Sequence, residues 1–420
     1  MPDWSRRELL QAVAIASGVA AARADATVTA RALGPPCRIR TITAGVALAD
    51  LQDLQAVESA IAMLRRARAL FEGVGFEVQT IRVAMSSTVA TMSAKEREGA
   101  LGALRALDGL LQAHGAIASI GPCARSGVYD GALAAWAGEL IRTTARLSTS
   151  IRIATPDAGI DGAGARMAAE AMAEISRRTP GGEGNFRFAA AACIPAGTPF
   201  FPVAWHDGPK TLALGLESPA LIADGIGGTR GSQGATTRLR DVLNDALAPI
   251  ERIAAPFAAT EGCTYLGVDP SPAPAKDRSI GAALEAFLQR PFGGSGTVDA
   301  CAVVTAALRT LSVKTCGYAG LMLPVLEDPV IARRATEGRF GLRDLLLFSS
   351  VCGTGLDLVP LAGDTPVDIL ERIIRDTAAL SSRWAKPLGV RLLLVPGRKS
   401  GETATFADPL LTDCRVMDPE

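Results

Sequence analysis

Apolar residues follow two different spacings along the chain, and segments with the two spacings alternate. Short, mostly apolar runs have the length of strands, at residues 38–46, 76–85, 117–120, 150–154, 186–192 and 212–216. Longer segments carry apolar residues every three or four positions, which predicts helices at residues 54–71, 93–114, 132–143, 161–178, 237–254, 279–287 and 297–311. The alternation continues through residues 342–348, 366–380 and 390–395.

This alternation predicts an α/β protein. Strands separated by helices of ten or more residues are typical of βαβ units around a mainly parallel sheet, whose buried strands are almost wholly apolar, as residues 188–194 are. No repeat and no long linker divides the chain, so we expect one large domain at residues 38–420. After the first residues no apolar run reaches the length of about 18 residues that a membrane-spanning helix needs.

The first 24 residues resemble an export signal. The pair Arg6-Arg7 precedes a modest apolar run at residues 9–22, which ends in small residues, as in twin-arginine signal peptides. We therefore predict a signal peptide at residues 1–24, a linker at residues 25–37 and an exported, periplasmic or extracellular protein. The alternative is an amphipathic N-terminal helix packed on the body of a cytoplasmic protein.

The amino-acid composition of the chain excludes several classes of function. The 420 residues include 43 basic and 43 acidic ones and are 48% hydrophobic, which is typical of a soluble globular protein and not of a nucleic-acid binder or a disordered chain. Four Trp, three Tyr and twelve Phe are too few for the stacking platforms that bind single-stranded nucleic acid. Two histidines and eight cysteines without a CxxC pair exclude the usual zinc and iron–sulfur spacings. We expect no metal, and the sequence identifies no cofactor.

Cys352 lies in surroundings that differ from those of the other cysteines. Gly353 and Gly355 follow it, and they allow a tight loop over residues 349–357 that exposes the thiol and brings Asp357 back toward it. An exposed thiol of this kind is a candidate nucleophile. The alternative is an inert, buried cysteine, which is the common state of a single cysteine in a core.

A glycine-rich run opens one of the predicted helices. Free backbone N–H groups at a helix start bind anions, and glycine lets a ligand approach the backbone closely. This makes an anion site from Gly293, Gly294, Ser295, Gly296 and Thr297. The alternative is simple N-capping of the helix by Ser295 or Thr297.

Three further side chains are candidates for the site. His206 lies beside Asp207 in a loop rich in aromatic residues, and an oriented imidazole can transfer protons. Asp269 ends a predicted strand, where α/β sheets place ligand-binding groups. Arg82 lies on a predicted strand and would hold a carboxylate if it faces a cavity. A structural histidine, a turn-capping aspartate and a solvent-facing arginine are the alternatives.

Residues 312–320 resemble the signature of glycyl-radical enzymes, with Lys314 in place of its arginine. In those enzymes the glycine lies in a short C-terminal loop, whereas Gly317 is far from the end of this chain. We therefore favour a packed glycine turn over a radical site.

Residues 38–415 resemble the family called domain of unknown function 711, or uncharacterised protein family 0210. The segments that carry the resemblance are residues 38–43, 267–274, 352–357, 364–366 and 390–391. The resemblance implies a single α/β barrel like that of pyruvate formate-lyase and brings no established activity. It also implies interest in His206, Asp269, Cys352 and Asp357, and it makes the residues before Arg38 an extension.

Two functions are consistent with these observations. The first is an enzyme that acts on a small acidic or polar metabolite with Cys352 as its reactive group, where Asp357 and His206 tune the thiol and Arg82 holds the anionic substrate. The second is an exported, non-catalytic ligand-binding or sensory protein that uses the same anion-binding groups. A homodimer is the assembly we expect for either.

Thiol reactivity separates these two functions. If Cys352 is a nucleophile, it should react with iodoacetamide faster than Cys193 or Cys301, which lie in apolar runs. An unreactive Cys352 favours the binding protein.

Overall fold

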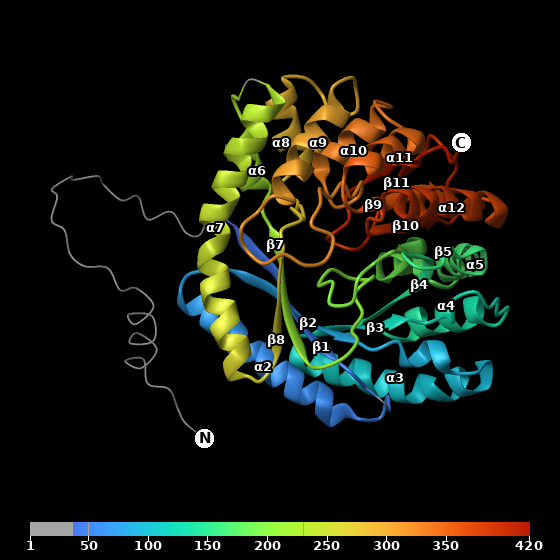
Figure 1. The fold of residues 1–420 in the computed structure, drawn as a ribbon. Coiled ribbons are helices and arrows are strands. Elements are labelled where there is room, and N and C mark those ends of the chain that lie inside the picture. Colours follow the sequence, from blue (N-terminus) through green and yellow to red (C-terminus); the bar gives the residue numbers. More distant parts are fainter. Residues whose placement is uncertain (1–36, 49, 230) are drawn as a thin grey trace. The chain divides into compact units, whose positions relative to one another are not determined.

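The computed structural model describes residues 37–48, 50–229 and 231–420 (Figure 1). The expected signal peptide at residues 1–24 and almost all of the expected linker at residues 25–37 lie outside the described residues. Within the described residues, no helix has both the length and the apolar character that crossing a membrane requires.

Five neighbouring parallel strands form the first half of one large sheet. They are β1 (Arg38–Val46), β2 (Val78–Met85), β3 (Ile117–Pro122), β4 (Leu147–Thr155) and β6 (Phe188–Ala192). The elements between them are α2 (Leu54–Gly73), η1 (Thr88–Thr91), α3 (Ala94–His114), α4 (Leu133–Thr143), β5 (Gly159–Ile160), α5 (Gly162–Arg178) and η2 (Pro180–Arg187). Helix α3 begins with the capping box that Ser93 and Glu96 predict.

The other half of the sheet runs in the opposite direction. Strand β7 (Thr211–Glu217) pairs antiparallel with β1, and β8 (Thr264–Asp269) continues parallel to β7. At the far side, β10 (Leu388–Val395) pairs antiparallel with β6, and β9 (Gly355–Ala362) lies parallel to β10. The remaining elements are α6 (Pro219–Ile226), α7 (Ser232–Thr260), α8 (Ile280–Leu288), α9 (Thr297–Leu308), α10 (Pro329–Thr336), α11 (Leu342–Val351), α12 (Val367–Trp384), β11 (Thr403–Ala404) and β12 (Cys414–Arg415).

One irregular segment joins the two edge strands of this sheet. On the side of β8, the Val268 amide donates to the carbonyl of Lys314 (2.9 Å), and the Cys316 amide donates to the carbonyl of Val268 (3.0 Å). On the side of β9, the Val325 amide donates to the carbonyl of Asp357 (3.0 Å). We call residues 314–325 the closing segment. It makes the α/β domain barrel-like, and it contains the residues that resemble a glycyl-radical signature.

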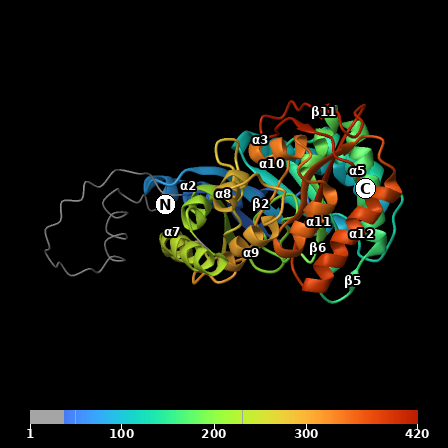
Figure 2. The ribbon, with the colours of Figure 1, turned by 90° about the horizontal axis from the view of Figure 1, so that it is seen from above.

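Apolar side chains pack on both sides of the sheet. The outer core lies between the strands and the helices, and helices such as α5, α11 and α12 are at the outside of the molecule (Figure 2). A smaller inner core lies within the curved sheet and contains Ala189, Ala191, Ile194, Phe200, Val203, Ala273, Tyr318 and Met322. Several inner-core residues come from the loop after β6 and from the closing segment, so these irregular segments fill the barrel.

The observed elements confirm most of the predicted alternation, but helices α6 and α10 and strand β9 are missing from it. Residues 342–348 belong to helix α11, in which Leu342, Leu345 and Phe348 are buried at the spacing of a helix face. Strand β9 is missing from the sequence prediction because Gly355 and Pro360 interrupt its apolar run, and both residue types are uncommon inside strands. Asp357 therefore lies on a strand and not in a loop.

The closing segment crosses the turn between α11 and β9 with almost no space between the two backbones. A Cβ atom added at Gly320 would overlap the Cα of Gly353, and the Gly353 amide donates to the carbonyl of Leu321 (3.1 Å). Only two glycines fit at this crossing.

We therefore expect Gly320→Ala to destabilise the domain by about 1–3 kcal/mol, as overpacking does in cores. Gly99→Ala is the matched control, since nothing lies within 4 Å of a Cβ there and alanine in the interior of α3 should stabilise by about 0.5–1 kcal/mol. Urea denaturation of the two variants measures both effects. Equal stability of the two variants would contradict the close crossing.

Candidate functional site

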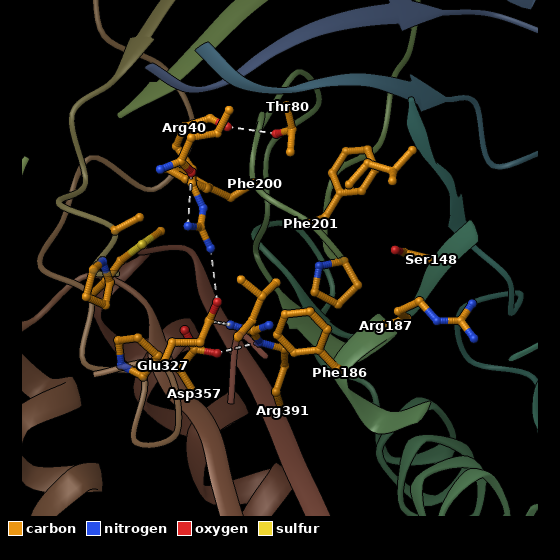
Figure 3. A pocket seen from close by; sticks show the side chains of 18 of the residues that line it. Arg40, Thr80, Ser148, Phe186, Arg187, Phe200, Phe201, Glu327, Asp357 and Arg391 are labelled. Atoms are coloured by element: carbon orange, nitrogen blue, oxygen red, sulfur yellow. Dashed lines mark hydrogen bonds and ion pairs between the residues drawn. The ribbon is translucent and has the colours of Figure 1, made fainter. Parts of the chain in front are cut away.

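A cavity of about 700 Å³ opens inside the barrel (Figure 3). Its walls come from β1, β2, β4, β9 and β10, from the loop after β6 and from the closing segment. The charged residues among its lining are Arg38, Arg40, Arg82, Arg146, Arg187, Arg391, Glu183, Asp277, Glu327, Asp357 and Asp408. The cavity is therefore densely charged, and arginine supplies all of its positive charge.

A chain of ion pairs crosses one wall of the cavity. Glu327 accepts from Arg40 Nη2 at Oε1 (3.1 Å) and from Arg391 Nη2 at Oε2 (3.0 Å), so both of its oxygens are used. Arg391 also donates from Nε to Oδ1 of Asp357 (Figure 3). These two arginines and two carboxylates neutralise one another, so this wall needs no ligand to balance its charge.

Burial and neighbouring charges act in opposite directions on Asp357. Its side chain is 12% exposed, and desolvation raises its pKa above the ordinary range of a carboxyl. The charge of Arg391 and the hydrogen bond from it lower the pKa, and the charge of Glu327 raises it again. Asp357 lies on strand β9 and lines the cavity, whereas the sequence predicts it in a loop beside Cys352.

Arg82 differs from the other two arginines because it has no ion-pair partner. It is 8% exposed, its Nε donates to Thr80 Oγ1 (3.0 Å), and its guanidinium carbon lies 5.1 Å from the ring centroid of Phe201. No carboxylate of the described residues lies within ion-pair distance of it. Burial and the charges of Arg40 and Arg391 lower the pKa of Arg82 to about 9, although the charge of Glu327 acts in the opposite direction. At neutral pH it is therefore a buried cation without an ion-pair partner.

The C-terminal part of the chain closes one side of the cavity. Asp408 and Leu410 are in its lining, and the amides of Ala407 (2.7 Å) and Asp408 (3.0 Å) donate to the carboxylate of Glu183 in η2. A residue more than 200 positions earlier in the sequence thus fixes this last segment.

Cys352 lies outside the cavity lining and has no exposed surface. It follows the last turn of α11, where Lys386 Nζ donates to the carbonyls of Ser349 and Cys352, the latter at 2.7 Å. The lysine thus satisfies the carbonyls at this helix end, as cations commonly do. The sequence predicts a tight loop here that exposes the thiol, but the structure has the end of helix α11 followed by the start of strand β9. The geometry therefore gives no support to a catalytic role for Cys352.

Asp269 holds the closing segment instead of a ligand. Its carboxylate is fully buried and accepts from the hydroxyl of Ser271 (2.6 Å) and from the amides of Tyr318 (2.8 Å) and Ala319 (3.2 Å). Burial raises its pKa to about 6 in spite of these donors. Gly317, with φ 70°, passes against the carboxylate where no side chain fits. The glycine-turn interpretation of residues 312–320 agrees with this geometry.

His206 has the contacts of a structural histidine. It is 1% exposed, Nε2 is 2.9 Å from the carbonyl of Gly208, and Nδ1 is 3.4 Å from the hydroxyl of Thr211. Desolvation lowers its pKa. His206 is not part of the cavity lining, so of the three predicted catalytic residues only Asp357 reaches the cavity.

The glycine-rich run at residues 293–297 also lies outside the cavity lining. The amide of Gly293 donates to Thr297 Oγ1 (3.1 Å), and a Cβ at Gly293 would press on Phe340. The run thus packs at the start of α9, as in the N-capping alternative. Arg82 is the one predicted ligand-binding residue that lines the cavity.

The sequence analysis does not single out Arg40, Glu327, Arg391 or Tyr318 as site residues. One signal points to Arg391, because it interrupts the otherwise apolar strand β10, LGVRLLLV. A lone arginine in a buried strand has to find a partner or line a cavity. Arg40 and Arg391 also lie in two of the segments that carry the family resemblance.

Comparison with known proteins gives the family. Residues 35–407 match the model described as "Uncharacterised ACR (DUF711)". The chain belongs to this family. A UPF0210 protein of Pyrobaculum islandicum is 30% identical over 383 residues, which cover 86% of this chain and 83% of the relative. UPF0210 proteins of Desulforudis audaxviator (28% identical, 88% of each chain) and Desulfovibrio desulfuricans (26% identical, 90% of each chain) are similar over their length as well. The resemblance to DUF711 is therefore confirmed.

These comparisons correct the description of the chain as a periplasmic protein with a twin-arginine signal peptide. The bacterial and archaeal relatives of this DUF711 protein are named without reference to export. No signal peptide is shown either, because the motif falls on residues outside the described part of the chain. The description as an exported, periplasmic protein with a signal peptide therefore has no support in these findings, and where the protein is located stays a prediction.

Burial reverses the order of thiol reactivity that the sequence suggests. Cys352, Cys123 and Cys301 have no exposed surface, whereas Cys193 and Cys263 are partly exposed. We therefore expect iodoacetamide to modify Cys193 and Cys263 of the native protein first. Peptide mass spectrometry at increasing reaction times gives the order. Modification of Cys352 before Cys193 would restore the thiol-centred site.

Proposed function

We propose that this DUF711 protein binds a small metabolite that carries a carboxylate, and that Arg82 is the residue that holds the carboxylate. The observation that carries the proposal is the buried guanidinium of Arg82, which lines the cavity without an ion-pair partner among the described residues. An unpaired charge in a buried position destabilises a fold unless a ligand or partner compensates it. A bound anion supplies that compensation.

The free part of Arg82 suits a carboxylate. Its Nε is used by Thr80, which leaves the two Nη groups to face a ligand, and two parallel N–H donors match the two oxygens of a carboxylate. Phosphate sites often combine a helix N-terminus with glycine backbone, and the candidate of that kind at residues 293–297 does not line the cavity. The contact of Arg82 with the ring of Phe201 holds the guanidinium in place.

The dimensions of the cavity support a small molecule. A volume of about 700 Å³ lies within the range of about 300–1,000 Å³ that is usual for metabolite pockets. Phe186, Phe200 and Phe201 line it along with the charged residues, so the ligand has both polar and apolar surfaces to contact. The proposal places the chemistry at Arg82 and Asp357 and not at Cys352, because Cys352 does not line the cavity.

Arg82→Ala should weaken carboxylate binding by about 10- to 100-fold, since a hydrogen-bonded charge pair contributes about 1.5–3 kcal/mol. Isothermal titration calorimetry with acetate, propionate, succinate, malate and lactate measures it, with inorganic phosphate as a comparison anion. Arg82→Lys should restore only part of the affinity, because an ammonium cannot form the bidentate pair.

The matched control is Arg372→Ala. Arg372 lies on α12, its side chain is 70% exposed, and it pairs with Asp368 on the helix surface, so its removal should leave binding unchanged. An equal loss in both variants, or no carboxylate binding to the wild-type protein, would overturn the proposed function.

A further inference from the structure

We infer that the ligand is a hydroxycarboxylate, and that Asp357 and Tyr318 recognise its hydroxyl group while Arg82 binds its carboxylate. This inference rests on the proposed function, because it names the class of carboxylate that the same cavity takes. It depends on two polar atoms that line the cavity and have no hydrogen-bond partner among the described residues.

The first of these atoms is Oδ2 of Asp357. Arg391 donates to Oδ1, and no donor among the described residues reaches Oδ2. Glu327 provides the contrast, because both of its oxygens accept from arginines. Asp357 lines the cavity with its side chain 12% exposed, and Oδ2 is not among the fully buried polar atoms, so it is free to accept a hydrogen bond from a group inside the cavity. A ligand O–H or N–H can supply that donor.

The second atom is the hydroxyl oxygen of Tyr318. Tyr318 is 9% exposed and lines the same cavity, and none of the hydrogen bonds between described residues involves its hydroxyl. Gly389 makes room for it, since a Cβ at that position would lie 2.8 Å from the Tyr318 hydroxyl. Burial and then the charge of Asp357 raise the pKa of Tyr318, so the phenol keeps its proton and can donate it in a hydrogen bond.

The backbone places these two groups on adjoining segments. Tyr318 belongs to the closing segment, whose Val325 amide donates to the carbonyl of Asp357 at 3.0 Å. Arg82, Tyr318 and Asp357 all line the same cavity. This one volume therefore contains a cationic donor, an acceptor and a neutral donor.

A hydroxyl group fits this pair better than the alternatives. It can donate to Asp357 Oδ2 and accept from the Tyr318 hydroxyl at once, so that no polar atom is left unpaired. An ammonium group has no acceptor for Tyr318 and adds positive charge beside Arg82 and Arg391. A methylene group leaves both protein atoms without a partner, and such a mismatch is a strong basis for discrimination between ligands.

The test compares carboxylates that differ only in the hydroxyl group. Malate and succinate form one pair, lactate and propionate another, and aspartate and alanine are the amino counterparts. Calorimetric titration of the wild-type protein should show at least about tenfold tighter binding of the hydroxy acid in a pair. Tyr318→Phe removes only the unpartnered hydroxyl and should reduce that preference several-fold while leaving the affinity for succinate or propionate unchanged.

Asp357→Asn tests the acceptor. Arg391 keeps its bond to Glu327 in this variant, and the preference for the hydroxy acid should fall to within about threefold. Arg372→Ala should preserve the full preference. Circular dichroism and the melting temperature establish that each variant is folded, and Tyr318→Phe decides the question if Asp357→Asn does not fold.

The outcomes separate this inference from the proposed function. Arg82-dependent binding with equal affinity for both members of each pair overturns the hydroxycarboxylate inference and keeps the carboxylate site. Tighter binding of aspartate or alanine than of malate or lactate also overturns it, in favour of an amino acid ligand. Failure of every carboxylate to bind overturns both.

Discussion

The buried carboxylate of Asp269 fixes the closing segment, on which the rest of the barrel and its cavity depend. Asp269 lies at the end of β8 and takes hydrogen bonds from Ser271 and from the amides of Tyr318 and Ala319. Since a buried carboxylate needs such donors, the closing segment must pass over it in a single conformation. From this point the segment continues past Gly353 to β9, joins the sheet edges, and brings Tyr318 and then Glu327 to the cavity.

The electrostatics of the cavity divide into a balanced part and an unbalanced part. Arg40, Glu327, Arg391 and Asp357 neutralise one another in sequence and so form a rigid polar wall. Arg82 lies against Phe201 without such a partner, and its depressed pKa expresses the cost of keeping it charged. The cavity thus contains the unpaired cation of Arg82 beside ion pairs that already neutralise one another. This arrangement favours a ligand that is anionic at one end and only polar at the other.

The sequence predicts the fold better than the site. Apolar spacing finds nearly all helices and strands because their buried faces repeat regularly, and it fails at β9, where Gly355 and Pro360 break the pattern. Among the site residues, Arg82 and Asp357 could be predicted as charged groups near the sheet. The partners of Asp269 and the burial of Cys352 could not, because both depend on a crossing between segments that are distant in the sequence.

The last segment of the chain determines when the cavity can form during synthesis. Its lining begins at Arg38 and ends at Leu410, and Glu183 fixes residues 407 and 408. During synthesis the N-terminal strands can pair early, yet the cavity has an open wall until residue 410 has left the ribosome. A ligand that needs the full wall stabilises by mass action only chains that extend to this residue, and it gives no such protection to chains that end earlier. Occupancy of the cavity would then mark a polypeptide that has been made at least as far as residue 410.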